Sequence, residues 1–245
     1  MTKIIKMDLY RFFRSVSTWI ILFADILLAF FSVMLVSANT SIQIYSNAAE
    51  LLAAQINGGM LMILCAVSVI IFVSDKYRNG FIKNIANQLS RREMLVFSEI
   101  IAAFVACALH FFVYSFCTIT AGAVFLGNTF SSFSFFAIMK LLLVQFVLHW
   151  GFCCLILLFY MLTNSTTFTM AAGFLIAFKI LNIFYVPIKR FTQFNIEQFM
   201  LDSNIFQIGM YSAKPIYIRA IIVGLLFLLT EIILLCMVMR KKEIK

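Results

Sequence analysis

The chain has 245 residues, of which 64% are hydrophobic and only 12% are charged. A soluble globular domain carries about 25% charged residues, so this composition excludes an ordinary soluble domain. Several uncharged intervals reach the length of about 20 residues that crosses a bilayer, which indicates a membrane protein with several spans. The net charge of +9 does not require a nucleic-acid partner, and none is predicted. A membrane protein with several spans concentrates Lys and Arg in its cytoplasmic loops, which accounts for the excess.

Residues 1–17 combine apolar and basic side chains at helical spacing. The apolar residues share one predicted face and the cations lie mostly on the other, which is the pattern of a helix lying in the membrane interface. The apolar face comprises Ile5, Leu9, Phe12, Phe13 and Val16, and the basic residues are Lys3, Lys6, Arg11 and Arg14. A basic leader that only orients the first span is the alternative interpretation.

Hydropathy predicts an all-α integral membrane protein, with a single transmembrane domain over residues 1–245 and six transmembrane helices. The spans are expected at about residues 19–37, 58–73, 96–126, 136–162, 168–186 and 217–239. The uncharged residues 100–139 would make one helix of about 60 Å, twice the hydrocarbon thickness. The turn formers at 127–134 are therefore expected to break it, and Pro187 is expected to end the fifth span.

The polar intervals predict how the spans are oriented. Residues 38–56 carry no Lys or Arg and are expected outside, and 188–216 is expected to form short amphipathic helices that dip into the outer leaflet as a partly re-entrant segment. The N-terminal region, residues 74–93 and the C-terminal tail hold thirteen basic residues, and the opposite side holds five. This bias predicts a multi-pass membrane protein with both termini in the cytoplasm.

Residues 74–93 form the only long polar interval between two strongly apolar segments. They combine five cations with an apolar repeat at helical spacing, which predicts a cytoplasmic loop containing a short amphipathic helix. The cations are Lys76, Arg78, Lys83, Arg91 and Arg92, and the apolar residues are Tyr77, Phe81, Ile82, Ile85 and Leu89. Such a loop can receive a push from a soluble partner. Alternatively, it is an ordinary basic loop that only fixes the topology.

No residue pattern predicts a catalytic, cofactor-binding or metal site. The six cysteines lie in apolar runs without a Cys-x-x-Cys pair, and we interpret them as small packing residues. His110 and His149 are single histidines within spans with no third ligand spaced with them, so we expect them to pack or to form hydrogen bonds. A membrane-embedded enzyme would need a convergent set of nucleophile, base or metal ligands, and only scattered candidates occur, so no enzyme is predicted.

Four ionisable residues fall inside the predicted spans: Asp25, Glu99, Lys179 and Glu231. Each is a functional candidate, because a charge in the hydrocarbon core is costly. One interpretation is that they line a polar pathway with an acidic inner mouth, suited to a cationic or amphipathic cargo. The other is that they pair internally between helices, and the sequence leaves both open.

Two stretches, residues 8–15 and 75–85, carry a resemblance to a known family. Together with the six spans, the interfacial N-terminal helix and the segment before the sixth span, they resemble the permease subunits of type-2 ABC exporters. Many such permeases have an acidic residue and then a Gly-Thr-Ile-Lys-Asn-like string just after the second span. Gly80, Ile82, Lys83 and Asn84 fit that string, whereas Phe81 replaces the usual Thr and Asp75 the usual Glu.

The resemblance implies that the loop after the second span is a coupling helix, seated in a groove of a separate nucleotide-binding subunit. The residues assigned to that contact are Asp75, Tyr77, Arg78, Gly80, Phe81, Ile82, Lys83, Asn84 and Ile85. Two copies of the nucleotide-binding subunit would bind ATP and Mg, and this chain would bind no cofactor itself. The chain would pair with a second permease, identical or homologous.

The short chain and its Lys-Asn-Ile string look most like small Gram-positive permeases. These include exporters of amphipathic cytolytic peptides, such as phenol-soluble modulins, and the lantibiotic-immunity permeases. The resemblance therefore implies ATP-driven export of amphipathic peptides or similar lipophilic cargo across a bacterial cell membrane. The alternatives are a permease for immunity to, or sensing of, lantibiotics and other antimicrobial peptides, or a small-drug exporter.

Overall fold

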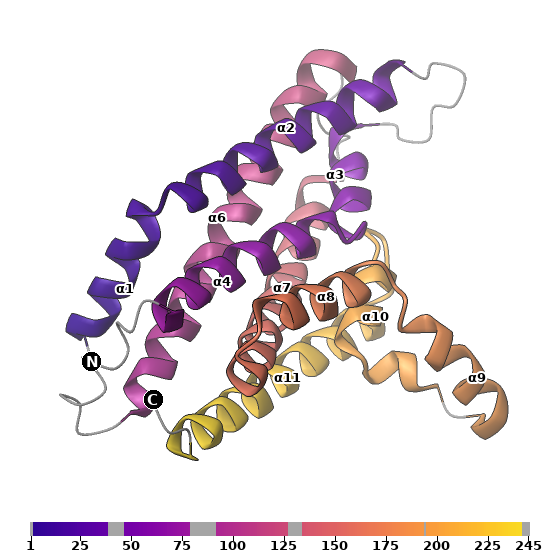
Figure 1. Cartoon of the computed structure of the whole chain (residues 1–245). Helices are drawn as coiled ribbons and strands as arrows, with labels where there is room; N and C mark the ends of the chain where they lie inside the picture. Colours follow the sequence, from indigo (N-terminus) through magenta and orange to yellow (C-terminus); the bar gives the residue numbers. More distant parts are fainter. Residues whose placement is uncertain (1, 39–46, 79–91, 127–133, 194, 242–245) are drawn as a thin grey trace.

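The computed structural model describes residues 2–38, 47–78, 92–126, 134–193 and 195–241, and all regular structure within them is helical (Figure 1). The elements are α1 (Thr2–Arg14), α2 (Val16–Ala38), α3 (Ala48–Ile56), α4 (Met60–Arg78), α6 (Glu93–Leu126), α7 (Ser134–Thr163), α8 (Thr166–Ala177), α9 (Asn182–Thr192), the 3-10 helix η1 (Ile196–Phe199), α10 (Leu201–Gln207) and α11 (Lys214–Lys241). Among the described residues, α2, α4, α6, α7 and α11 are long and apolar enough to cross a membrane, and the bent pair α8–α9 is a sixth candidate.

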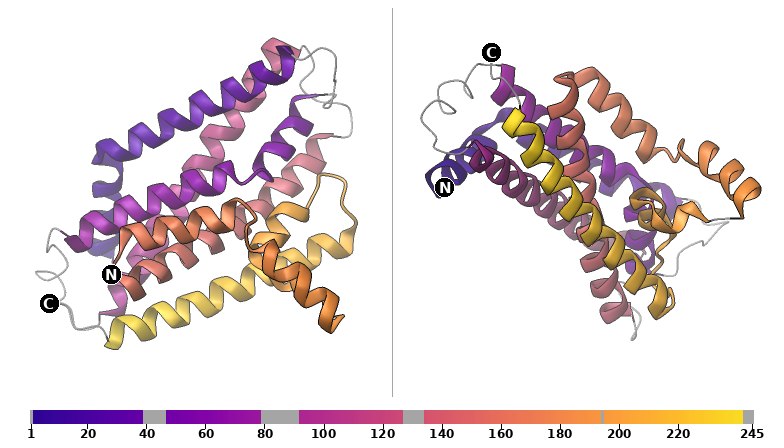
Figure 2. Two further views of the ribbon diagram at one scale, coloured as in Figure 1. Left: turned by 45° about the vertical axis from the view of Figure 1, so that its right-hand side comes forward. Right: turned by 90° about the horizontal axis from the view of Figure 1, so that it is seen from below.

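The long helices run side by side and give the bundle two ends. One end holds α1, the end of α4, the start of α6 and the last turn of α11, and we name it the α1 end (Figure 1). The opposite end holds α3, α10 and the first turn of α11, and we name it the α3 end. Figure 2 shows that α9 projects away from the bundle.

The core of the bundle lies around α7. In its most apolar stretch 67% of the residues are buried, against 28% in the corresponding stretches of α2 and α11. α7 packs against α4, α6, α8, α10 and α11, whereas α2 and α11 keep one apolar face exposed. Apolar helices with exposed apolar faces are what a lipid environment accommodates.

Most of the predicted helices are confirmed. The expected segments 19–37, 96–126, 136–162 and 217–239 coincide within about one turn with α2, α6, α7 and α11. The expected break within residues 100–139 is confirmed, because α6 ends at Leu126 and α7 begins at Ser134. The expected break after Thr163 is also confirmed, and Ser165 caps α8 there by accepting a hydrogen bond from the first turn.

The prediction of one continuous helix over residues 168–186 is wrong. α8 ends at Ala177, and α9 follows with its axis bent by 56°. Lys179, between them, has φ 59°, a left-handed conformation that a right-handed helix does not contain. Pro187 lies inside α9 and does not end the span. Hydropathy detects the apolar run but not this backbone turn within it.

The prediction that residues 38–56 are a polar external segment misses α3. Asn47 caps this helix, and Leu52 and Ile56 are fully buried in the bundle. The polar side chain of Gln55 makes its hydrogen bonds inside the bundle as well. The mean polarity of residues 38–56 does not reveal the apolar face of a helix as short as α3.

The segment 188–216 contains short helices, as predicted, but its first residues still belong to α9. η1 and α10 follow, and α10 packs against α7 and α11 at the α3 end. Leu201 and Ile205 of α10 are buried, so this helix belongs to the packed bundle.

Candidate functional site

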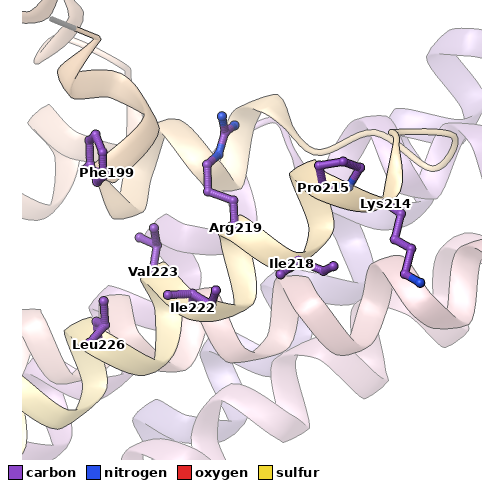
Figure 3. Close-up of a pocket in the computed structure, with 8 residues that line it drawn as sticks. All are labelled: Phe199, Lys214, Pro215, Ile218, Arg219, Ile222, Val223 and Leu226. Carbon is purple, nitrogen blue, oxygen red and sulfur yellow. The ribbon is translucent and has the colours of Figure 1, made fainter.

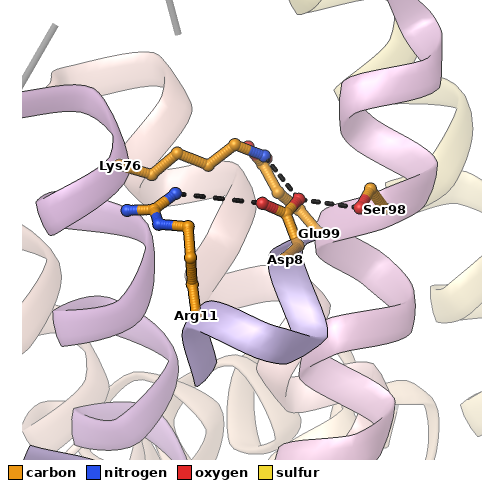
Figure 4. A network of polar contacts seen from close by, with 5 residues as sticks. All are labelled: Asp8, Arg11, Lys76, Ser98 and Glu99. Atoms are coloured by element: carbon orange, nitrogen blue, oxygen red, sulfur yellow. Dashed lines mark hydrogen bonds and ion pairs between the residues drawn. The ribbon is translucent and has the colours of Figure 1, made fainter. Parts of the chain in front are cut away.

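A group of charged residues from three helices lies inside the α1 end of the bundle (Figure 4). The ammonium of Lys76, on α4, lies 2.8 Å from Asp8 Oδ2 on α1 and 2.9 Å from Glu99 Oε1 on α6. Ser98 Oγ donates a hydrogen bond to Asp8 Oδ2 at 2.7 Å. A guanidinium nitrogen of Arg11 lies 3.8 Å from Asp8 Oδ1. We name these five residues the charge network.

The charge network is buried and electrically balanced. The side chains of Lys76 and Asp8 are 0% exposed and that of Glu99 is 1% exposed. Removing one ion from water costs several kcal/mol, so each buried charge needs an opposite charge close by. Two cations face two carboxylates here, and Arg11 is the member that keeps contact with solvent, with 25% of its side chain exposed. The network can therefore hold helices together without an unpaired buried charge.

α1 is helical over most of the predicted interfacial segment. One face of it is buried against the bundle, and this face only partly overlaps the predicted apolar face. Its buried residues are Ile4, Asp8 and Phe12, spaced four apart on one face. Phe13 and Val16, expected on the apolar face, are 43% and 72% exposed. Asp8 can face inward because the ammonium of Lys76 on α4 and the hydroxyl of Ser98 on α6 contact its carboxylate.

The predicted loop 74–93 begins later than expected. α4 continues to Arg78, so Asp75 and Tyr77 belong to the last turns of this long helix. Asp75 is exposed, but the Tyr77 ring packs edge-on against Tyr160 of α7, with centroids 5.7 Å apart. Lys76, expected to be a solvated loop cation, is buried because two carboxylates compensate its charge. The remaining predicted coupling residues lie outside the described part of the chain: Gly80, Phe81, Ile82, Lys83, Asn84 and Ile85.

The charge network lies near the end of α4 and the start of α6, the two helices that flank residues 79–91 in the sequence. It joins α1 to the last turns of α4, before that segment, and to the first turns of α6, after it. The first turn of α6 has a further link, because Arg240 of α11 pairs with Glu93. The ends of α4 and α6 that flank this segment in the sequence are thus linked to α1 and α11.

The four ionisable candidates for a pathway do not meet at one place. Asp25 of α2 pairs with His110 of α6 at 2.5 Å, and Glu99 belongs to the charge network. Lys179 is exposed at the bend before α9, with its ammonium 4.2 Å from the ring centroid of Phe206. For Asp25 and Glu99 the structure thus supplies the internal partners that the second interpretation expected.

Glu231 differs from the other three ionisable candidates. It lies on α11 and is only 2% exposed. Neither of its carboxylate oxygens has a hydrogen-bond partner among the described residues. A buried carboxylate without a partner is unfavourable, so Glu231 keeps the functional interest that the sequence gave it.

Neutral polar residues that the sequence reasoning missed tie the α3 end together. Gln145 of α7 donates from Nε2 to Asn57 Oδ1 and to the carbonyl of Ile205, both at 2.7 Å. Asn57 in turn donates to the carbonyl of Ile208 at 2.6 Å. A glutamine in the middle of an apolar span is a usable signal, because its amide is costly to bury without partners. These bonds link α7 to α10 and to the residue that ends α3, which in turn holds the residue after α10.

A groove runs along the outer face of α11 (Figure 3). Its volume is about 480 Å³, and its wall is almost entirely apolar. It is lined by Phe199, Lys214, Pro215, Ile218, Arg219, Ile222, Val223 and Leu226. Lys214 and Arg219 belong to its half nearer the α3 end, and their charged groups point to opposite sides of α11 (Figure 3). The groove contains none of the four ionisable pathway candidates, and its chemistry fits an apolar chain that carries an anionic group.

No protein-family model matches this chain, and no curated protein matches it. What the described residues establish is a class: an all-helical chain with five helices, or six with the bent pair, that are long and apolar enough to cross a membrane.

Proposed function

We propose that the chain is the transmembrane subunit of an ATP-driven exporter of the type-2 ABC kind. The charge network carries this proposal, because it joins three helices around the two points where residues 79–91 connect to the bundle. That segment holds the Gly80, Ile82, Lys83 and Asn84 string. A nucleotide-binding subunit that moved this segment would shift the α1 end of the bundle as one unit. An exporter needs such a movement from its coupling contact.

The proposed orientation has α1 in the inner membrane interface, both termini in the cytoplasm, α8–α9 as the fifth of six spans and the part before α11 near the outer surface. The excess of basic residues at the α1 end supports it. So does the exposure of Phe13 at the end of α1 and of Val16 at the start of α2, which leaves both apolar side chains free to contact acyl chains. Residues 79–91 would then face the compartment that contains ATP.

The proposed cargo is an amphipathic peptide or a similar lipophilic molecule. The groove on α11 supports this class, because an apolar wall beside Lys214 and Arg219 suits a greasy chain with an anionic group. ATP and Mg would be bound by two copies of a nucleotide-binding subunit. A second permease, identical or homologous, would complete the pathway, and Glu231 is the pathway residue whose burial without a partner most favours that role.

The proposal is tested at the coupling segment. The proposal predicts a cassette ATPase gene beside the gene of this chain, and the two proteins are co-expressed and purified together. Phe81→Asp is expected to abolish co-purification of the ATPase and ATP-dependent peptide uptake into inverted vesicles, because it puts a charge into an apolar docking contact. Phe191→Asp is the matched control, since Phe191 lies on α9 and is 86% exposed.

The control is expected to keep both the partner and the transport. Both variants must elute from size exclusion as the wild type does, so that misfolding is not read as lost coupling. If the wild-type chain retains no ATPase, or if Phe81→Asp transports as well as the wild type, the exporter assignment is refuted.

A further inference from the structure

Three cysteines from three different helices meet in the core of the bundle. They are Cys65 of α4, Cys107 of α6 and Cys153 of α7, and each is 0% exposed. Their three Sγ atoms all lie within 4.8 Å of one another. The sequence predicted no metal site because each sulfur comes from a separate helix, so no Cys-x-x-Cys spacing announces the group.

The spacing of the three sulfurs is close to that of a three-coordinate metal site. A metal–sulfur bond of about 2.3 Å places the sulfurs of a planar three-sulfur site about 4 Å apart. The observed upper limit of 4.8 Å is within reach of small rotations of the three side chains. A buried cysteine can be a plain packing residue, but packing alone does not require three thiols to converge on one point.

Two histidines lie one helical turn from this group. His110 follows Cys107 by three residues on α6, and His149 precedes Cys153 by four residues on α7, so each shares a face with its cysteine. His149 Nδ1 donates to the carbonyl of Gln145 at 2.8 Å, and His110 Nδ1 pairs with the carboxylate of Asp25.

Because Nδ1 of each ring is engaged, Nε2 is left with the lone pair in the neutral form. Both Nε2 atoms are buried without a hydrogen-bond partner among the described residues. In metal sites the histidines that bind the ion are typically held this way, by a carboxylate or a carbonyl on the other nitrogen, but neither histidine belongs to the close group of three sulfurs here. The core thus combines three sulfurs with two buried proton acceptors.

We propose that Cys65, Cys107 and Cys153 form a three-coordinate site for Cu(I). Sulfur ligands of cysteine favour Cu(I), whereas Zn²⁺ in structural sites takes four ligands, and the close group contains only three. Each thiol that binds as a thiolate releases one proton, and copper stays Cu(I), so no electron transfer is needed. The bound ion would fasten α4, α6 and α7 to one another. This site does not depend on the proposed export function.

The test uses the full-length purified chain, reduced and kept without oxygen. Cu(I) is titrated against bicinchoninate, a coloured Cu(I) chelator, and the chain is expected to withdraw one Cu(I) per molecule. X-ray absorption of the loaded protein is expected to show three sulfur neighbours at about 2.3 Å. Zn²⁺ in a parallel titration is expected to bind more weakly than Cu(I).

Serine variants locate the site. Cys65→Ser, Cys107→Ser and Cys153→Ser are each expected to weaken Cu(I) binding by more than about 100-fold, the upper range for losing an outer-shell partner. Cys154→Ser is the matched control, because Cys154 is adjacent to Cys153 and equally buried. It is expected to bind as the wild type does, as is Cys117→Ser on α6.

Three results would overturn the site. They are failure of the wild type to compete with the chelator, an equal loss of affinity in Cys154→Ser, and tighter binding of Zn²⁺ than of Cu(I). If a variant does not elute as a folded protein, the alanine variant at the same position replaces it. The sulfur count on the wild type then decides independently, and two or fewer sulfur neighbours would refute a three-cysteine site.

Discussion

Lys76 places its ammonium between the carboxylates of Asp8 and Glu99, and all three side chains are buried. Lys76→Met keeps much of the apolar stem but leaves the two carboxylates close together without the cation between them. Removing one partner of a buried pair costs about 3–5 kcal/mol, so we expect a loss of that order in the free energy of unfolding. Unfolding by SDS titration in mixed micelles measures it.

Two further variants give this prediction its controls. Lys214→Met removes an exposed lysine in the groove on α11 and is expected to leave stability unchanged. Lys76→Met combined with Glu99→Gln is expected to recover part of the loss, because one of the two stranded carboxylates is gone. A Lys76→Met protein as stable as the wild type would mean that the charges are solvated rather than paired.

Asp202 gives a prediction for pH. Burial raises the pKa of its carboxyl above the usual range, although hydrogen bonds from Ser203 and from the Tyr185 hydroxyl act in the opposite direction. A carboxyl with a raised pKa favours the folded state when it is protonated, so its contribution to stability is lost as pH rises through that pKa. We therefore expect Asp202→Asn to unfold at a higher temperature than the wild type at pH 7.5.

The difference between Asp202→Asn and the wild type should shrink as the pH falls through the raised pKa of Asp202, because the wild-type carboxyl then becomes neutral too. Asn keeps an oxygen that can accept from Tyr185. Asp75→Asn, at an exposed carboxylate on α4, is the control and should show no such dependence. A constant difference at all pH values would show that the effect is not one of ionisation.

The residues of the charge network show how far the sequence could go. Asp8 and Lys76 are 68 positions apart, and each reads locally as a surface charge of an amphipathic helix. The cost of burying Lys76 disappears only when both carboxylates are present, and a one-dimensional pattern cannot show that they are. Glu99 is recognisable because it falls within a predicted apolar span, and that signal is local.

At the level of elements, the turn between α3 and α4 packs tightly against the end of α8. Gly59 has φ +80°, and a Cβ at this position would lie 2.3 Å from the carbonyl oxygen of Ala177. Gly59→Ala would therefore combine left-handed strain of about 1–2 kcal/mol with a clash against backbone. We expect it to lower the free energy of unfolding by about 3 kcal/mol, measured in the same SDS titration.

Gly209→Ala is the matched substitution for Gly59→Ala. A Cβ at Gly209 would have only the Ser212 hydroxyl near it, at 3.7 Å, and this glycine does not have a positive φ. Its stability should stay within about 0.5 kcal/mol of the wild type. Equal losses of unfolding free energy in the two variants would mean that the close contact of the α3–α4 turn with α8 is not what makes Gly59→Ala destabilising.

The same elements show why the fold was predictable in part. Helices α2, α6, α7 and α11 are long apolar runs with polar ends, and length alone separates such runs from loops. Hydropathy does not predict α3 or the α8–α9 bend, because each depends on local detail. A nine-residue helix is shorter than a hydropathy window, and a left-handed Lys179 leaves the apolar run around it unbroken.

At the scale of the whole molecule, the contacts at each end of the bundle fix the direction of each helix. Tyr77 packs against Tyr160, and Arg240 pairs with Glu93, so α7 and α11 both finish at the α1 end. The ammonium of Lys140 lies 3.6 Å from the Tyr217 ring centroid, so both helices start toward the α3 end. The chain must therefore run from the α1 end to the α3 end between α7 and α11.

α8 makes this return passage, and it is short. Twelve helical residues span about 18 Å, against about 30 Å for a hydrocarbon core. α9 continues at an angle of 56° with most of its side chains exposed. α8 is thus shorter than each of the five long apolar helices. α9 carries apolar side chains away from the bundle.

Single-cysteine labelling tests whether this passage crosses the membrane. Lys6→Cys on α1 and Tyr211→Cys before α11 are both exposed and lie at opposite ends of the bundle. With an impermeant maleimide on intact cells, we expect Tyr211→Cys to react, and Lys6→Cys to react only after the membrane is opened. The wild type is the control, since four of its six cysteines are buried and none is highly exposed. Reaction of both variants from one side would remove the fifth crossing, because an exposed segment before α11 would then share the side of α1.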